Sequence, residues 1–257
     1  MFIGGMMKRI TILVTVLFII LLCHGDFIWE EPLWVNQAAM IQNIHTDFEP
    51  QTVSFSEGFY VVWVESEASQ GQLLSQKYSV EGEALWGTPQ QVIITEQLPR
   101  LTSIICDNED NLIIGYHQYQ DENPCRIIKL DSEGELVWEI SLPYPNNYIN
   151  WFELKKGIDN NFYACIHAIN EEGYTFNTFY LIDNAGSILP GWSAGLIISE
   201  CGLLDWCVDN SGNLLVLNNS FEMNLELEKY NSENQRLFSE IVVSSNTYLE
   251  WSSLQPA

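Results

Sequence analysis

The stretch Leu130-Asp131-Ser132-Glu133-Gly134-Glu135-Leu136-Val137-Trp138 places a polar turn between an apolar residue and an aromatic one. Similar phrases occupy residues 78–86, 182–192 and 230–238. Their turn residues are separated by 52, 52 and 48 positions and are Gly82, Gly134, Gly186 and Asn234. Glycine and asparagine tolerate the positive φ that a tight hairpin requires. The spacing therefore predicts a repeat of about 50 residues with one such hairpin in each unit.

A second phrase, about twenty residues earlier in each unit, gives the same period. There a polar turn opens into an apolar, strand-like run that begins at Phe59, Leu112, Phe162 and Leu214, which lie 53, 50 and 52 positions apart. In the second unit the predicted strands are Leu101–Cys106, Leu112–Tyr119, Cys125–Leu130 and Leu136–Leu142. Four antiparallel strands repeated at this interval are typical of a β-propeller blade. We therefore expect an all-β propeller, with no helix beyond the N-terminal segment.

The predicted units are residues 49–95, 96–149, 150–199 and 200–245, and partial blade strands occupy residues 26–48 and 246–257. Pro32–Ile41 resembles the predicted outer strand at Leu85–Ile93, whereas Tyr248–Ser252 matches the predicted inner strand at Gly202–Cys207. Two arrangements stay open. Strands from both ends could complete a fifth blade, or the chain is a fragment of a longer propeller.

The phrase Lys129–Glu139 resembles the repeat of propellers related to pyrroloquinoline-quinone-dependent dehydrogenases and their non-catalytic relatives. The segment from Tyr60 to Gly87 is also similar to repeats of large secreted bacterial proteins. The first resemblance implies an aromatic residue that docks between blades, at the positions of Trp86, Trp138, Trp192 and Phe238. It identifies no quinone-binding residue, so we expect no cofactor. Recurrence at one register independently predicts inter-blade packing, with roughly 150–250 Å² buried per ring, rather than carbohydrate stacking.

The N-terminus has the pattern of a secretory signal peptide over residues 1–25. Lys8-Arg9 precedes an uncharged apolar run of 13 residues, Ile10–Leu22, and Cys23-His24-Gly25 follows. The run is shorter than the ~20 residues of a membrane span. We therefore expect export to the periplasm, the cell surface or the medium of a bacterial-type cell. An uncleaved anchor is one alternative. Lipid attachment at Cys23 is another, although the preceding Leu22 is larger than usual there.

The charge excludes two classes of partner. The chain carries 34 acidic residues against 10 lysines and arginines, for a formal net charge of -24. Such a surface repels the phosphate backbones of nucleic acids and the surfaces of anionic membranes. We therefore expect neither nucleic acids nor such membranes as partners. The five cysteines beyond the leader are scattered and contain no C-x-x-C pair, so we expect core thiols at Cys106, Cys125, Cys165, Cys201 and Cys207.

Candidate chemistry is sparse. Asp107–Asn111 and Asp209–Asn213 present alternating oxygens that suit Ca²⁺, but neither is followed by a bidentate glutamate, and Asx turns explain both. His117 and His167 stand five residues after Leu112 and Phe162, so a shared ligand or metal site is the alternative to two ordinary strand histidines.

No G-x-S-x-G elbow is present, and no pair of carboxylates stands out. We predict no catalytic, cofactor-binding or metal-binding residue. The expected function is a non-catalytic binding or scaffolding module with a protein or glycan ligand. The rival is a propeller hydrolase or lyase acting on polysaccharide.

Overall fold

The computed structural model describes residues 50–67, 70–95, 99–118, 125–143, 148–169, 172–199, 202–219 and 224–244. The predicted leader, Cys23, Pro32–Ile41, Cys201 and Tyr248–Ser252 lie outside these ranges. The described part of the chain is all-β, and it holds no helix with the length and hydropathy of a membrane span.

Sixteen strands form four antiparallel sheets of four, each with its strands in chain order. The strands are β1 (Gln51–Phe55), β2 (Gly58–Glu67), β3 (Gln70–Ser79) and β4 (Gln90–Thr95) in sheet 1; β5 (Arg100–Cys106), β6 (Leu112–His117), β7 (Cys125–Leu130) and β8 (Leu136–Ser141) in sheet 2; β9 (Tyr148–Lys156), β10 (Phe162–Ile169), β11 (Thr175–Ile182) and β12 (Leu196–Ser199) in sheet 3; and β13 (Gly202–Val208), β14 (Leu214–Asn219), β15 (Asn224–Tyr230) and β16 (Arg236–Ser244) in sheet 4.

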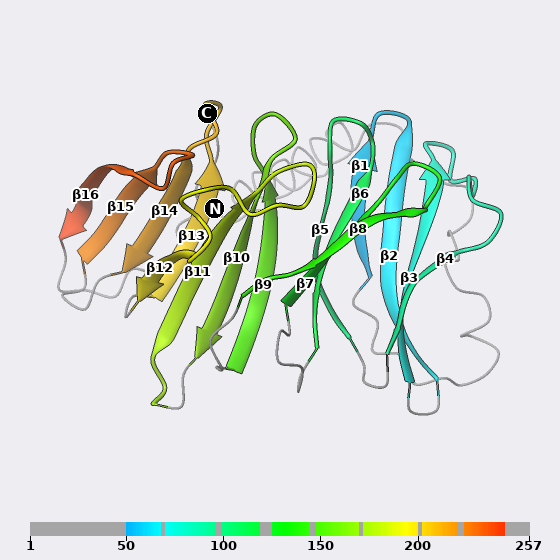
Figure 1. Ribbon diagram of the computed structural model, residues 1–257, viewed down its shortest axis with the longest axis horizontal. Coiled ribbons are helices and arrows are strands. Elements are labelled where there is room, and N and C mark those ends of the chain that lie inside the picture. Colours follow the sequence, from blue (N-terminus) through cyan, green and yellow to red (C-terminus); the bar gives the residue numbers. More distant parts are fainter. Residues whose placement is uncertain are drawn as a thin grey trace, which may run out of the picture.

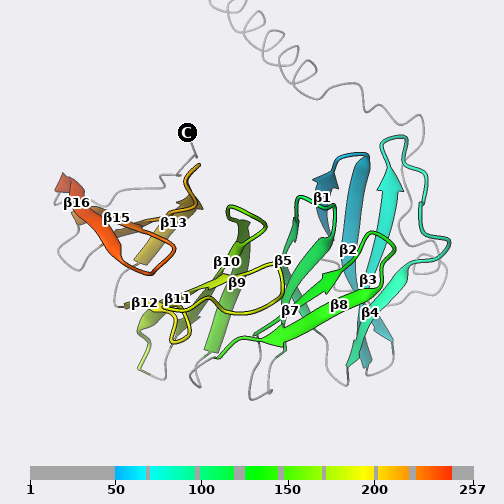
Figure 2. The same ribbon diagram turned by 45° about the horizontal axis from the view of Figure 1, so that its top comes forward.

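The sheets stand side by side in sequence order, from sheet 1 at the right of Figure 1 to sheet 4 at the left. Their first strands adjoin, β1 against β5, β5 against β9 and β9 against β13, and the later strands fan outward, as Figure 2 shows. This is the blade arrangement of a propeller. The predicted fold class is confirmed. The four sheets do not close into a ring.

The turn that decided the fold has the predicted geometry in every sheet. Gly82, Gly134, Gly186 and Asn234 have φ of 84°, 89°, 82° and 62°. In the sheet 2 hairpin, the amides of Asp131 and Gly134 donate to the carbonyls of Glu135 and Asp131, each at 3.0 Å. This is a three-residue hairpin loop that ends in a left-handed residue.

Three apolar layers fill the junctions between sheets, and each draws residues from both sheets beside it. Between sheets 2 and 3, for example, Ile113 and Ile127 meet Phe152, Leu154 and other buried side chains. The alternation along each strand sends one set of side chains to the preceding sheet and the other to the following sheet. The core is therefore divided among the junctions.

Two of the predicted docking aromatics lie just ahead of the outer strand rather than on it. Trp138 lies in β8 and Phe238 in β16, but Trp86 precedes β4 and Trp192 precedes β12. The outer strand predicted at Leu85–Ile93 therefore begins later than expected, at Gln90. Prolines explain the delay, since Pro89 and Pro190 lack the amide hydrogen that strand pairing needs.

Candidate functional site

The three tryptophans cross the sheet junctions in the same way. Each indole Nε1–H donates to a backbone carbonyl in the last hairpin of the following sheet. Trp86 reaches Ser132 O at 3.1 Å, Trp138 reaches Asn184 O at 3.0 Å, and Trp192 reaches Ser232 O at 2.8 Å. The first and third rings are buried, with 7% and 0% of their surface exposed. The polar edge of each ring is satisfied while its apolar face packs.

The positive-φ glycine of the receiving hairpin lies directly under the ring. A Cβ added to Gly186 would stand 2.9 Å from Trp138 Cδ2, and one added to Gly134 would stand 3.1 Å from Trp86 Cζ2. Glycine is needed there for both its φ and its lack of a side chain. The tryptophan and the turn glycine of the repeat are thus the two halves of one contact.

Phe238 differs from the other three aromatics. It is 37% exposed, and it has no N–H to donate. It lies in β16, on sheet 4, at the left end of the row in Figure 1.

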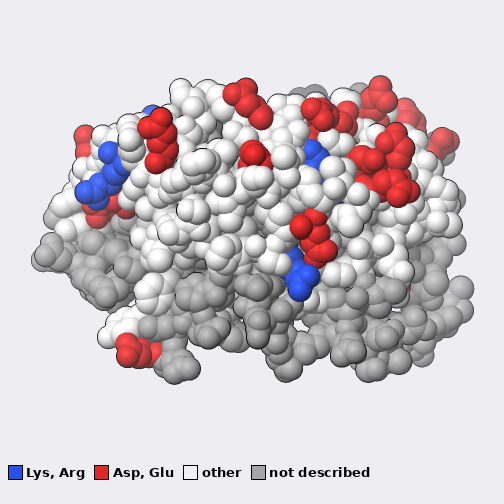
Figure 3. All heavy atoms as spheres, viewed as in Figure 1, with Lys and Arg blue, Asp and Glu red and all other residues white. Residues whose placement is uncertain are grey.

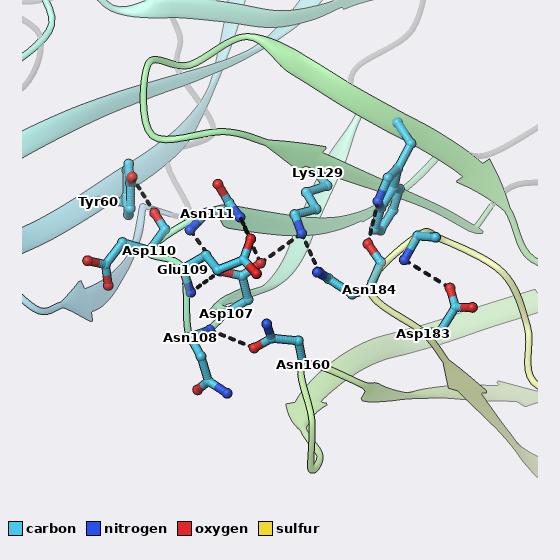
Figure 4. A network of polar contacts seen from close by, with 12 residues as sticks. Tyr60, Asp107, Asn108, Glu109, Asp110, Asn111, Lys129, Asn160, Asp183 and Asn184 are labelled. Atoms are coloured by element: carbon cyan, nitrogen blue, oxygen red, sulfur yellow. Dashed lines mark hydrogen bonds and ion pairs between the residues drawn. The ribbon is translucent and has the colours of Figure 1, made fainter.

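A buried ion pair, which the sequence did not predict, lies within sheet 2 at its junction with sheet 3 (Figure 4). Lys129 Nζ lies 2.8 Å from Asp107 Oδ2, and the two side chains are 4% and 2% exposed. The same ammonium donates to the side-chain oxygen of Asn184 in sheet 3. Burial opposes ionisation of Asp107, but Lys129 and the hydrogen bonds from Asn111 and Glu109 outweigh it and hold its pKa below the ordinary value. Asp107 therefore stays ionised at neutral pH.

In the other sheets, the positions equivalent to Asp107 and Lys129 hold another ion pair, a cation–π contact or uncharged residues. In sheet 4, Lys229 Nζ lies 2.7 Å from Asp209 Oδ2, with about a quarter of each side chain exposed. In sheet 1, Lys77 lies over the Phe55 ring, 4.7 Å from its centroid. In sheet 3, Gly157 and Leu181 occupy the two places. A lysine five positions before the positive-φ turn residue, in three of four units, was the signal available in the sequence.

The acidic turns proposed as Ca²⁺ candidates use their oxygens internally. Asp107 Oδ1 accepts from the amides of Glu109 and Asn111 at 2.8 and 2.9 Å. Asp209 Oδ1 accepts in the same way from Ser211 and Asn213, both at 2.9 Å. Asp131, Asp183 and Asn231 repeat the pattern. The Asx-turn interpretation is confirmed. Within the described ranges, no group of three or more His, Cys, Asp or Glu side chains is arranged to hold a metal.

The two strand histidines have different surroundings. His117 is 1% exposed at the end of β6, and burial, together with the charge of Arg100, lowers its pKa to about 4. His167 stacks on Trp151 with ring centroids 5.1 Å apart, and its Nδ1 lies 2.6 Å from Asn177 Oδ1. Trp151 and Asn177, which contact His167, belong to the same sheet as His167.

The cysteines of the described ranges are free and buried. Burial raises the pKa of Cys106 to about 11, and it also raises the pKa of Cys125, Cys165 and Cys207. The core-thiol prediction is confirmed at these four positions. Protonated, buried thiols are poor nucleophiles.

One cluster of ionisable groups joins the first strands of sheets 3 and 4, and we call it the inner-strand cluster. Lys155 Nζ lies 3.5 Å from Glu153 Oε1 and 3.7 Å from Asp205 Oδ1. Trp206 Nε1 donates to Glu153 Oε2 at 2.6 Å, and Lys155 Nζ stands 4.5 Å from the centroid of that indole. The side chains of Glu153, Lys155 and Asp205 are 38%, 29% and 22% exposed. It is a pair of partly exposed carboxylates that share one cation.

Exposed carboxylates gather at the edge where the first and the last hairpin of each sheet lie, along the upper margin of Figure 3. We call this the hairpin edge. Its exposed acids are Glu57, Glu81, Glu83, Glu109, Glu133, Glu135, Asp159 and Glu233. Such an edge disfavours anionic partners and favours neutral or cationic ones.

Comparisons with known proteins identify no family. No protein-family model matches the chain, and no curated protein matches it. Among solved structures, a subtype N10 neuraminidase-like protein of A/little yellow-shouldered bat/Guatemala/060/2010 is similar, with a TM-score of 0.45, 9% identity and coverage of 74% of this chain and 58% of that one. A protein of unknown function from Dyadobacter fermentans DSM 18053 gives 0.49, 8%, 76% and 69%.

A polysaccharide lyase of family PL25, an ulvan lyase, gives a TM-score of 0.46 with 8% identity, and the match covers 73% of this chain and 56% of the lyase. This chain therefore spans little more than half of the lyase and of the neuraminidase-like protein. At such values the similarity adds no argument about function to what the strand order already shows about fold.

Proposed function

We propose that the protein is a non-catalytic binding or scaffolding module that acts outside the cell, with a protein or glycan ligand. The observation that carries the proposal is that polar and reactive side chains of the described residues make structural contacts or are buried. The buried ion pair, the Asx oxygens and the indole N–H groups of Trp86, Trp138 and Trp192 are engaged between or within sheets. The thiols are buried. What remains for a partner is surface, above all the hairpin edge.

The location and the relationship belong to the same proposal. A leader over residues 1–25 would deliver the module to the periplasm, the cell surface or the medium. Its repeat would be related to the non-catalytic relatives of quinoprotein dehydrogenases, because the aspartate, glycine and tryptophan stand in the same order.

Binding and turnover can be separated by experiment. The exported protein is incubated with a panel of neutral, cationic and anionic polysaccharides, and both retention on the polymer and release of reducing ends or unsaturated products are measured. The proposal expects retention or protein capture without products. Turnover would overturn it, and the inner-strand cluster would then be the first place to look.

Matched variants sharpen this test. Glu153→Gln and Asp205→Asn remove the two carboxylates of the inner-strand cluster. Quadruple replacement of Glu81, Glu83, Glu133 and Glu135 by Gln neutralises part of the hairpin edge. A binding module loses affinity with the quadruple variant and shows no product with any of them. An enzyme loses all turnover with one single variant, because proton transfer needs that specific group.

A further inference from the structure

The junction contact has a donor half and a receiving half, and sheet 1 presents a receiving half of its own. The donor is an aromatic residue near the outer strand of one sheet. The receiver is the Asx or Ser turn of the next sheet, with its positive-φ residue under the ring. Sheet 1 has the same hairpin at Ser79–Gly82, where Gly82 has φ of 84° and its amide donates to Ser79 O at 3.0 Å.

The face of sheet 1 that turns away from sheet 2 is also built as a junction. It carries Phe59, Val61, Trp63, Leu74 and Tyr78, and these described members of the cluster all come from β2 and β3. Trp63 is 1% exposed, and its Nε1–H has no acceptor among the described residues. An apolar face of this kind needs a partner layer, and that layer must bring a hydrogen-bond acceptor for the indole.

The spacing of the repeat indicates which residue would be the donor for sheet 1. Trp34 stands 52 residues before Trp86, and Trp86 stands 52 residues before Trp138. Leu33-Trp34 therefore corresponds to Leu85-Trp86, and Pro32–Ile41 corresponds to the outer-strand segment that follows it. We propose that Trp34 is a fourth docking tryptophan, and that Pro32–Ile41 packs on the outer face of sheet 1 with the Trp34 ring over the Ser79–Gly82 hairpin.

Length, polarity and charge agree with this occupant. The residues between Trp34 and Gln51 can extend to roughly 55 Å, more than the length of any strand of the sheet. Asn36 and Gln37 bring side-chain acceptors, and Pro32–Ile41 carries no charge, so it approaches the exposed Glu81 and Glu83 without repulsion. A tethered segment also reaches a millimolar effective concentration, which a second copy of the chain does not at ordinary protein concentrations.

The test is a photo-crosslink in the full-length chain. Val80 lies in the hairpin and is 40% exposed, so a benzoylphenylalanine there is compatible with folding. The proposal expects a crosslinked peptide that contains Trp34, formed within one chain when light and isotope-labelled chains are mixed. The same crosslinker at Leu136, which is 59% exposed on sheet 2, is the control and should not capture that peptide.

Other outcomes overturn the proposal. A crosslink between chains would make a second copy the occupant, a crosslink to residues 245–257 would make it the opposite end of the chain, and no crosslink would leave the face without Trp34. A second measurement compares thermal unfolding of Trp34→Leu and Trp29→Leu. Trp29 aligns with Glu81 and Glu133 in the repeat and not with a docking position. The first change should lower the midpoint by several degrees and the second should leave it within one degree; equal shifts would contradict the assignment.

Discussion

Replacement of Lys129 by leucine tests how much the buried ion pair with Asp107, which lies within sheet 2 beside sheet 3, contributes to stability. The change removes an ammonium that lies 2.8 Å from Asp107 and leaves a carboxylate that is 2% exposed. A buried charge that loses its partner costs about 3–5 kcal/mol. Leucine is the appropriate substitute because Leu181 already occupies the equivalent place in sheet 3. Urea denaturation at pH 7, followed by tryptophan fluorescence, should show that the free energy of unfolding falls by that amount.

The same substitution at Lys229 is the matched control. Its pair with Asp209 is equally short, at 2.7 Å, but about a quarter of each side chain is exposed. Solvent screening limits such a pair to roughly 0–1 kcal/mol. Lys229→Leu should therefore destabilise the protein several-fold less than Lys129→Leu.

A double-mutant cycle isolates the charge interaction. Asp107→Asn keeps an oxygen that can cap the amides of Glu109 and Asn111 but removes the charge. The double variant Asp107→Asn with Lys129→Leu should cost less than the sum of the two single changes, with a coupling of about 0.5–3 kcal/mol. Additive costs, or a loss below about 1 kcal/mol for Lys129→Leu, would refute the reasoning.

The pH dependence follows from the same pair. The pKa of Asp107 is lowered in the folded protein, so its contribution is complete above the unfolded value and is lost as the pH falls through the folded value. The penalty of Lys129→Leu should therefore shrink in acid, because the isolated carboxyl takes up a proton. A penalty that is constant from pH 7 to pH 3 would contradict this.

The remaining predictions concern the turns, the tryptophans and the thiols. Gly186→Ala should cost more than Gly173→Ala: both residues have positive φ, but only at Gly186 would the new Cβ meet a ring, at 2.9 Å, so the difference in urea midpoint measures the clash. Equal costs would show that the ring yields freely. Trp192→Phe should destabilise by about 1–3 kcal/mol in the same assay, because Ser232 O loses its donor in a buried junction. A neutral effect would remove the hydrogen bond from the account. The four described cysteines should resist a thiol reagent at pH 8 until denaturant is added, because burial raises their pKa, and immediate labelling, mapped by mass spectrometry, would contradict their placement. Burial opposes ionisation of Asp209, but Lys229 and three hydrogen bonds outweigh it and hold its pKa at about 2. The wild-type protein should therefore lose the contribution of Asp209 to its unfolding free energy between about pH 4 and pH 2. The Asp209→Asn variant, which lacks this carboxyl, should lose less unfolding free energy over the same pH range.

The repeat could be predicted because its two halves leave separate marks on the sequence. Gly134 and Gly186 are required by backbone conformation, and Trp86 and Trp138 are required by packing, so both recur at fixed spacing. The strands of sheet 2 follow closely, with β6 ending at His117 within the predicted Leu112–Tyr119.

The ion pairs were harder to predict because they depend on contacts between distant segments. Asp107 was interpreted only as a turn residue, since its partner stands 22 residues later on β7. The solution also changes from sheet to sheet: Gly157 and Leu181 show that the same place can be filled without charge. The inner-strand cluster is assembled across two sheets, where Lys155 and Asp205 are 50 residues apart. Composition alone offers no means of selecting them among 34 acids.

The central claim is that each sheet is joined to the next by an indole donating to a hairpin carbonyl. Selective ¹⁵N labelling of tryptophan in the full chain tests it directly. Hydrogen exchange of the indole protons and ¹⁵N-edited NOE spectra are then measured. The account predicts that the indole Nε1 protons of Trp86, Trp138 and Trp192 exchange slowly and show NOEs to residues 131–134, 183–186 and 231–234 respectively. Indole protons that exchange as fast as in denatured protein, or that show NOEs only within their own sheet, would contradict it.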